Sequence, residues 1–328
     1  MAPSDGGGFV WTPGARRSVN VLVAMQAMHM CASQVVELAS EDLLVTLVQK
    51  VFREKPELVA ERDEKRRKLG ESPDAEALEK VEAEFDEQIK VKANSRAAYI
   101  MSTVQVVIAL GDFVIGPILG AAADAYGRKS LVLIAPAVQG IFRAAIALRP
   151  SVNLFVAFQM VQGITNIMYG RVIQLMIGDI VPRHTFEYQR VGGLSSKVNT
   201  VLGLIFMLVG GRVSLRTGFL SSALLSLGGF LALSFFMTDT LRVADRVPFT
   251  AKNAHPFSFI RFFNRSPMLR RIGIFALISE APNFEGYEGL FFIHKWGWMK
   301  QQRTWMQIVR RSIHYFNFNC APRHSSCV

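Results

Sequence analysis

Long apolar blocks separated by charged segments constrain this chain more than any other feature of its sequence. The blocks are about 20 residues long, and a helix of that length crosses a hydrocarbon core of about 30 Å. They predict about seven membrane spans, which we place at residues 19–39, 97–123, 130–148, 152–179, 196–213, 217–237 and 272–293. The predicted fold class is therefore an all-α, polytopic transmembrane helix bundle.

Basic residues predict how the chain crosses the membrane. If residues 1–18 are cytoplasmic, the Lys and Arg residues outside the 40–96 insertion and the tail fall mainly inside, including those of a basic linker at 238–271. The short outer loops then contain only Arg149, Arg212 and Arg216. Because Lys and Arg concentrate in cytoplasmic loops, we expect a multi-pass membrane protein with its N-terminus inside. The net charge of +11 then needs no nucleic-acid partner, and no nucleic-acid-binding motif occurs.

Residues 40–96 interrupt this pattern with a long charged insertion on the predicted extracytoplasmic side. Pro56 suits the first turn of one helix, and Ser72-Pro73 suits the start of another. Four apolar residues then follow at helical spacing: Leu78, Val81, Phe85 and Ile89. We expect a hairpin of two solvent-facing helices, which acts either as a solvated spacer or as a lid or partner-binding surface.

The loop after the second predicted span reads GAAADAYGRK. Gly127 permits a tight turn between two antiparallel spans, and Arg128 and Lys129 hold that turn at the cytoplasmic face. Asp124 is placed to pair with cations of neighbouring loops. With Gly120, these residues resemble the signature loop of major facilitator transporters, in which they act as a gating element.

Further matches follow in the order that this family predicts. Gln162-Gly163 resembles a second motif in the fourth helix, and Met237-Thr-Asp239 resembles the acidic exit of the sixth. The fourth helix also ends on the acidic, proline and arginine pattern of the family: Asp179, Pro182, Glu187 and Arg190. The resemblance implies secondary transport of a small solute by alternating access, around a site near the bilayer midplane.

The sequence also departs from the family pattern. Ala125 and Gln159 stand where the family has arginines. The arginine of the second motif is associated with proton coupling, so Gln159 at its position argues against proton antiport, and the coupling ion stays open. The family has twelve helices, whereas this sequence predicts about seven, followed by an atypical tail at 294–328. One alternative is a non-transporting half-transporter that acts as a membrane scaffold or interaction protein. Another is an incomplete fragment of a twelve-helix transporter, and self-association of such halves is a further expectation.

Two charged residues lie deep in adjacent predicted spans. Asp112 is about 18 Å and Arg143 about 20 Å from the cytoplasmic end, at 1.5 Å per residue. Charges at such depth are costly unless they are paired. We therefore predict an ion pair between Asp112 and Arg143, with either a structural role or a role in responding to protons or substrate.

The family's first, fourth and seventh helices line its central cavity. The resemblance therefore implies a solute cavity lined by Gln26, His29, Gln162, Asn166 and Arg171. Gln34 of the first span is a further candidate for solute contact, and weaker candidates are Asn199, Glu280, Asn283 and Glu285. Arg171, about 12 Å from the inner helix end, is the best candidate for binding an anionic group. The alternative is that such polar side chains only hydrogen-bond neighbouring helices.

Catalytic chemistry has no support in the sequence. No nucleophile elbow, phosphate-binding glycine loop or metal-ligand spacing occurs, so we expect neither an enzyme, a cofactor nor a metal site. The expected partners are the lipid bilayer, a small-molecule solute and a coupling ion.

Overall fold

The computed structural model of this chain describes residues 11–69, 75–183 and 185–250, together with a few later positions. Those positions are 255, 266–268, 270–271, 274, 302, 305–306 and 308–309. Within the described residues the chain is helical and contains no strand, which confirms the all-α prediction. The predicted seventh span and the tail lie almost wholly outside this part of the chain.

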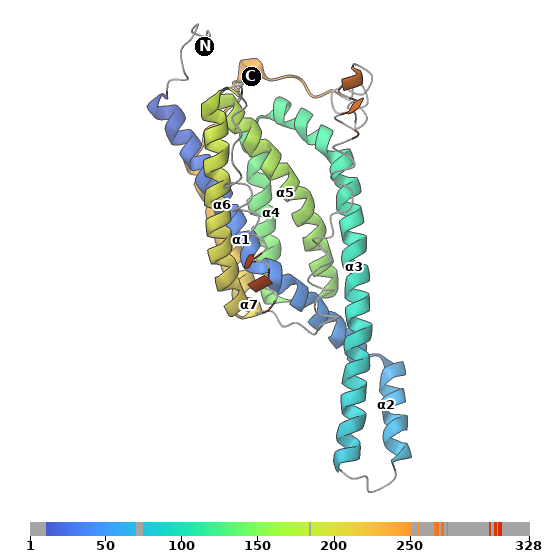
Figure 1. Cartoon of the computed structure of the whole chain (residues 1–328). Helices are drawn as coiled ribbons and strands as arrows, with labels where there is room; N and C mark the ends of the chain where they lie inside the picture. Colours follow the sequence, from blue (N-terminus) through green and yellow to red (C-terminus); the bar gives the residue numbers. More distant parts are fainter. Residues whose placement is uncertain are drawn as a thin grey trace.

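Seven α-helices and one short 3-10 helix, η1 (Val243–Asp245), make up the described fold (Figure 1). They are α1 (Pro13–Arg53), α2 (Pro56–Lys68), α3 (Ala75–Tyr126), α4 (Arg128–Leu148), α5 (Val152–Ile180), α6 (Phe186–Arg212) and α7 (Leu215–Phe236). The first six predicted spans fall within α1 and α3 to α7. By length and apolarity α1, α4, α6 and α7 can each cross a membrane, and α3 is a fifth if its two bent halves form one span.

Hydroxyl side chains fix where three of these helices begin. Ser151, Thr185 and Ser214 each accept a hydrogen bond from the backbone N–H three residues later. Such caps satisfy one of the donors that the first turn of a helix leaves free. The turns before α5, α6 and α7 are therefore specified locally.

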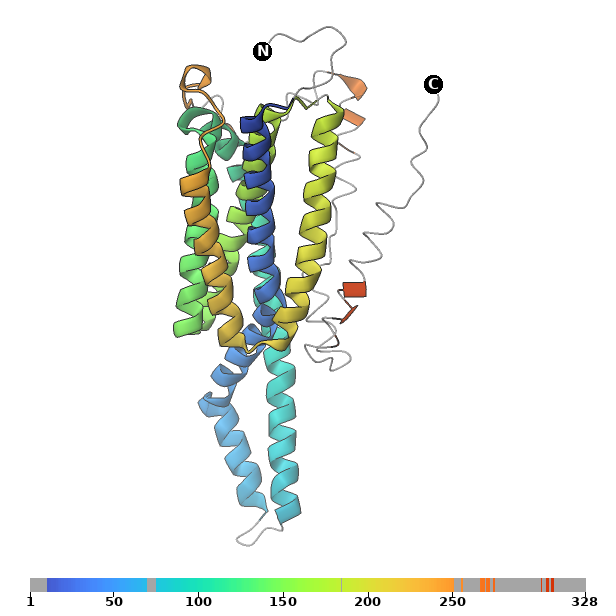
Figure 2. The ribbon, with the colours of Figure 1, turned by 90° about the vertical axis from the view of Figure 1, so that its left-hand side faces the viewer.

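The bundle is built around α1, which packs against α3, α5, α6 and α7 (Figure 2). Gly210 lets α6 approach α1 closely, because a Cβ there would lie 2.8 Å from the carbonyl oxygen of Val35. One buried apolar cluster includes Leu22, Ile173 and Leu233. A second, nearer to α2, includes Leu44, Phe158 and Phe219. The helices around α1 are therefore held by side-chain packing along their length.

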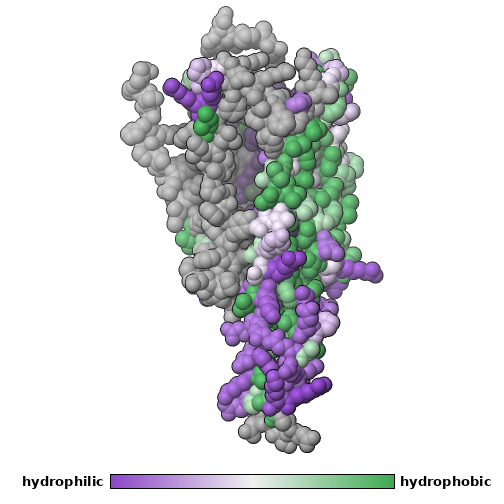
Figure 3. Space-filling model, turned by 90° about the vertical axis from the view of Figure 1, so that its right-hand side faces the viewer, coloured by the Kyte–Doolittle hydropathy of each residue, from purple (hydrophilic) through white to green (hydrophobic). Residues whose placement is uncertain are grey.

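The charged insertion is continuous with the bundle. α1 runs past residue 39 to Arg53, and α3 begins at Ala75 and continues past residue 96. Both predicted boundaries of the 40–96 segment therefore lie inside helices. α2 lies beside the first part of α3, and Leu58, Phe85 and Ile89 form a small core between them. This hairpin projects from the bundle (Figure 1) and is hydrophilic, whereas the described bundle surface above it is largely hydrophobic (Figure 3).

α3 bends by 45° between Ala75–Asp112 and Val114–Tyr126. Pro117 explains the position of the bend, because it lacks the N–H that would bond to the carbonyl of residue 113. The bend places Asp112 and Gly116 at the point where α3 changes direction toward the signature loop.

Candidate functional site

The signature loop forms a tight turn between α3 and α4. Gly127 has φ +94°, which a side chain would disfavour, and a Cβ there would collide with the Asp239 carboxylate that follows α7. That carboxylate accepts a hydrogen bond from the Arg128 N–H at 3.1 Å and pairs with Arg246 at 3.1 Å. The turn is therefore packed directly against the segment that leaves α7.

The two basic side chains of the signature reach different helices. The Arg128 guanidinium contacts the Asp179 carboxylate and donates to the Leu175 carbonyl oxygen at 2.7 Å, both on α5. Lys129 Nζ donates to the Ser234 carbonyl oxygen of α7 at 2.8 Å. We call this set of contacts among α3, α4, α5 and α7 the signature latch.

Asp124 and Gly120 have smaller roles in the latch than we expected. The ion pair that Asp124 makes is with Arg128 in the same loop, at 3.5 Å, and not with a cation of a neighbouring loop. Its backbone carbonyl accepts the N–H of Val247 at 3.1 Å. Gly120 lies inside α3 and lines a cavity described below. The turn itself therefore depends on Gly127.

The residues predicted to end the fourth span, which is α5 in the structure, lie beside the latch. The Pro182 carbonyl oxygen accepts the N–H of Thr185 at 3.0 Å, which closes the turn into α6. Glu187 accepts a hydrogen bond from Trp11 Nε1 at 3.2 Å and contacts Arg190 at 3.7 Å. Asp179 completes this group, through its contact with Arg128.

The predicted pair between Asp112 and Arg143 is wrong. Arg143 is fully buried and donates to Ser33 Oγ of α1 at 3.1 Å and to Ser226 Oγ of α7 at 2.5 Å. Asp112 pairs instead with Arg171 of α5, at 2.8 Å and 3.0 Å. Equal depth does not decide which face of a helix a residue occupies, and α3 packs mainly along α5 rather than α4.

Four of the five predicted cavity residues surround one cavity of about 370 Å³, which we call the polar cavity. Its walls come from α1, α3 and α5, and they carry Gln26, His29, Gln162 and Asn166 together with Gln34. Arg171 does not line it. Asn199 lies on α6 outside its wall, and Glu280, Asn283 and Glu285 fall outside the described residues.

A hydrogen-bond network orders one wall of the polar cavity. Gln139 Nε2 donates to Asn166 Oδ1 at 2.7 Å, and His29 Nε2 lies 2.9 Å from the same oxygen. The His29 ring stacks on Tyr169 at 4.1 Å between centroids. Because Asn166 Oδ1 can only accept, His29 Nε2 is the donor, and a neutral ring then presents Nδ1 as an acceptor. Among the described residues, neither His29 Nδ1 nor Gln162 Oε1 has a hydrogen-bond partner.

Sequence reasoning did not single out Gln139, which is fully buried and also donates to Thr165 Oγ1 at 2.8 Å. The available signal was an amide within the otherwise largely apolar block that forms α4. A polar side chain there needs a partner on another helix, and Asn166 supplies it.

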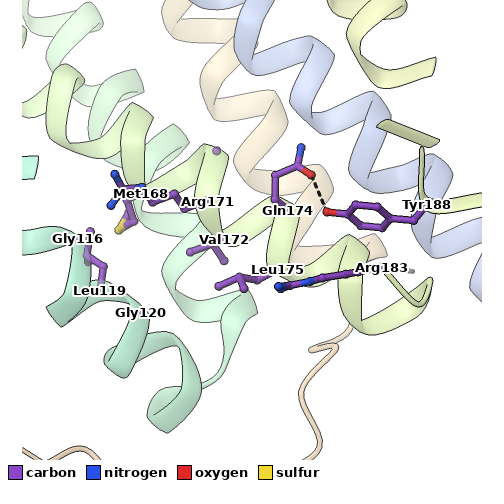
Figure 4. A pocket seen from close by; sticks show the side chains of 11 residues that line it. Gly116, Leu119, Gly120, Met168, Arg171, Val172, Gln174, Leu175, Arg183 and Tyr188 are labelled. Atoms are coloured by element: carbon purple, nitrogen blue, oxygen red, sulfur yellow. Dashed lines mark hydrogen bonds between the residues drawn. The ribbon is translucent and has the colours of Figure 1, made fainter. Parts of the chain in front are cut away.

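Arg171 lines a neighbouring cavity of about 450 Å³, which we call the arginine cavity (Figure 4). It lies between α5, the part of α3 beyond the bend, and the start of α6. The two cavities share Gly170. The predicted solute-contact residues are therefore divided between two adjoining spaces.

Comparison with known proteins finds a family model that matches the sequence and solved structures that resemble the fold. The family model described as Major Facilitator Superfamily matches residues 91–294. The crystal structure of the human organic anion transporter MFSD10 (TETRAN) resembles the fold with a TM-score of 0.64 and 16% sequence identity. That match covers 92% of this chain and 70% of the other. No curated protein sequence matches the chain.

Proposed function

Because the chain belongs to the Major Facilitator Superfamily, whose members are transporters rather than enzymes, we propose that it moves a small polar solute across a membrane. The observation that carries this proposal is the convergence of Gln26, His29, Gln162 and Asn166 around one polar cavity. These residues lie far apart in the sequence, on α1 and α5. Spanning helices that turn polar side chains toward a shared space are suited to holding a solute away from lipid.

The solute meets hydrogen-bonding side chains together with one carboxylate, because Glu37 also lines the polar cavity. His29 and Gln162 line the cavity, and each carries a buried acceptor, Nδ1 and Oε1 respectively, that has no hydrogen-bond partner among the described residues. Gln139 and Tyr169 hold the side chains of Asn166 and His29 in place, so this part of the wall is preorganised. A solute with hydroxyl or amine groups fits this wall.

In alternating access, the signature latch would hold several helices together as one rigid unit. Its contacts join α3, α4, α5 and the segment after α7 at one end of the bundle. These helices therefore move together when the cavity changes the side on which it opens. The latch lies on the cytoplasmic side, and the hairpin lies outside.

Uptake by the purified full chain in liposomes tests the transport proposal. A panel of labelled neutral, cationic and anionic polar solutes identifies the class, and Gln162→Ala is then compared with Asn153→Ala. Asn153 is exposed in the first turn of α5 and lies away from the cavity lining. We expect Gln162→Ala to raise KM about fivefold, because one hydrogen bond to a solute contributes roughly 1 kcal/mol. Absence of uptake for every solute would refute the proposal.

Membrane orientation needs a separate experiment. In a chain whose three cysteines are replaced by serine, Glu79→Cys places a thiol on the exposed part of the hairpin. A membrane-impermeant maleimide applied to intact cells should label it without permeabilisation. Labelling only after permeabilisation would reverse the proposed orientation.

A further inference from the structure

The arginine cavity combines apolar walls with cationic groups. Leu119 of α3 and Met168, Val172 and Leu175 of α5 form the apolar part, and Arg171 is one of the cations. Figure 4 shows Arg171 on the upper part of the α5 segment and Arg183 beside Leu175, below Tyr188. The two guanidinium groups therefore lie on either side of an apolar surface.

The ion pair with Asp112 uses only part of the hydrogen-bonding capacity of Arg171. Its Nη2 lies 2.8 Å from Asp112 Oδ1 and 3.0 Å from Oδ2, but only the contact with Oδ2 has hydrogen-bond geometry. The Arg171 side chain is 53% exposed and that of Asp112 is 33% exposed. A bidentate pair would form two parallel hydrogen bonds, one to each carboxylate oxygen, from two N–H groups of one guanidinium edge. This pair leaves donors of Arg171 free for another anion.

The backbone leaves space beside Arg171. A Cβ at Gly116 would collide with Arg171 Nη1, so glycine at the bend of α3 lets the guanidinium lie there. A Cβ at Gly120 or Gly170 would meet nothing within 4 Å. Ligand atoms can therefore occupy the cavity next to the guanidinium without displacing a helix.

Arg183 supplies the second charge. Its guanidinium lies over Gly178 of α5, where a Cβ would be 2.7 Å from Nε. Within the described part of the chain, no ion pair or hydrogen bond of its side chain is found. Tyr188 and Gln174, joined by a hydrogen bond of 3.4 Å, line the same end of the cavity.

We propose that the arginine cavity binds an amphipathic anion, in which a carboxylate or phosphate group is joined to an apolar chain. The anionic group replaces Asp112 at Arg171, with Arg183 adding to the positive field, and the chain lies against Met168, Val172 and Leu175. Asp112 therefore competes with the ligand for the Arg171 guanidinium and pairs with it when the ligand is absent. This site does not depend on solute transport through the polar cavity.

The chemistry of the walls selects the ligand class. An inorganic anion would gain only the contacts with the guanidinium groups, and a neutral lipid or alcohol would gain only apolar contacts. An amphipathic anion gains both. It can reach the cavity either as a free organic anion from water or as an anionic lipid from the bilayer.

Direct binding to the purified full chain in nanodiscs of zwitterionic lipid tests the site. The probe is labelled dodecanoate, and dodecanol and inorganic phosphate are the comparators. We expect dodecanoate to bind at least about tenfold more tightly than either. Arg171→Gln should weaken it about tenfold or more, and Asp112→Asn should tighten it several-fold. Arg190→Gln, which alters an exposed arginine outside the cavity lining, should leave it unchanged.

The opposite signs of the two variants separate ligand binding from a structural role. If Asp112 and Arg171 only support the fold, both variants weaken binding alike, and the proposal is overturned. Equal binding of dodecanol also overturns it. The double variant Asp112→Asn/Arg171→Gln removes both charges together, and dodecanoate binding must stay lost in it while the melting temperature reports folding.

Nanodiscs that contain phosphatidylglycerol distinguish the two sources of ligand. If an anionic lipid occupies the cavity, the apparent Kd of dodecanoate rises in these nanodiscs for the wild type, and Arg171→Gln removes that dependence. If the ligand is a free organic anion, the Kd is the same in both lipids. Each result supports the anion site, whereas no saturable binding in either lipid rejects it.

Discussion

The guanidinium of Arg128, the first residue of α4, lies against the carboxylate of Asp179 in the last turn of α5. Only 9% of the Arg128 side chain and 23% of the Asp179 side chain are exposed. Thr240, beyond α7, donates to the same carboxylate at 2.8 Å. One carboxylate therefore connects the signature loop with two other helix ends.

Replacing Asp179 by Ala should destabilise the folded protein by about 1–3 kcal/mol, because the buried charge of Arg128 then keeps, among the described residues, only its longer ion pair with Asp124. Thermal unfolding of the purified chain measures the change. Arg190→Ala is the matched control, since its contact with Glu187 is 3.7 Å long and its side chain is 70% exposed. That exposed pair contributes about 0–1 kcal/mol, so equal losses in the two variants would contradict the role of the latch.

The two glycines of the signature should respond differently to alanine. At Gly127, alanine must adopt φ +94° and its Cβ meets Asp239, so we expect a loss of stability above about 1 kcal/mol. At Gly120, inside α3, a Cβ meets nothing within 4 Å, and alanine should stabilise the helix by about 0.5–1 kcal/mol. Denaturation curves of both variants compare them directly. Destabilisation by Gly120→Ala would show that the space beside α3 is smaller than described.

Double-mutant cycles should show which residue Asp112 pairs with. A cycle between Asp112→Asn and Arg171→Gln should give a coupling energy of about 0.5–3 kcal/mol, as expected for residues in contact. The same cycle between Asp112→Asn and Arg143→Gln should give no more than about 0.3–0.5 kcal/mol. Unfolding free energies of the three single and two double variants supply both values. A larger coupling energy for Asp112 and Arg143 than for Asp112 and Arg171 would instead support the ion pair that was predicted from depth.

The hairpin should be a local unit of stability. Phe85 packs with Leu58 and Ile89 between α2 and α3, away from the core of the bundle. Phe85→Ala should therefore speed amide hydrogen exchange in residues 56–68 and 75–92 and leave α4 to α7 unchanged. Val91→Ala, at a position 49% exposed, should alter neither region. Loss of protection throughout the bundle would show that the hairpin folds as one unit with it.

Helical periodicity explains why most of the polar cavity was predictable. On α5, Gln159, Gln162 and Asn166 follow one another at intervals of three and four, so they share a face. Arg171 comes five residues after Asn166, which turns it by about 140° at 3.6 residues per turn. It therefore faces the neighbouring cavity, although it lies on the same helix.

Contacts between helices were harder to predict from the sequence. Depth along a helix follows from counting residues, but the neighbour that each face meets depends on how the whole bundle packs. Arg143 meets serines of α1 and α7 for this reason, and Asp112 meets Arg171. The Asp239 contacts at the signature turn also join segments that only the folded bundle brings together.

The bend divides α3 into two arms of unequal length, so the helix can act as a lever. The arm that carries the hairpin, Ala75–Asp112, is about 57 Å long, and the arm that ends at the signature turn, Val114–Tyr126, is about 20 Å long. A rotation about the joint therefore moves the hairpin end about three times as far as the turn. As long as the bend keeps its angle, force applied at the hairpin end would reach the latch with about a threefold mechanical advantage.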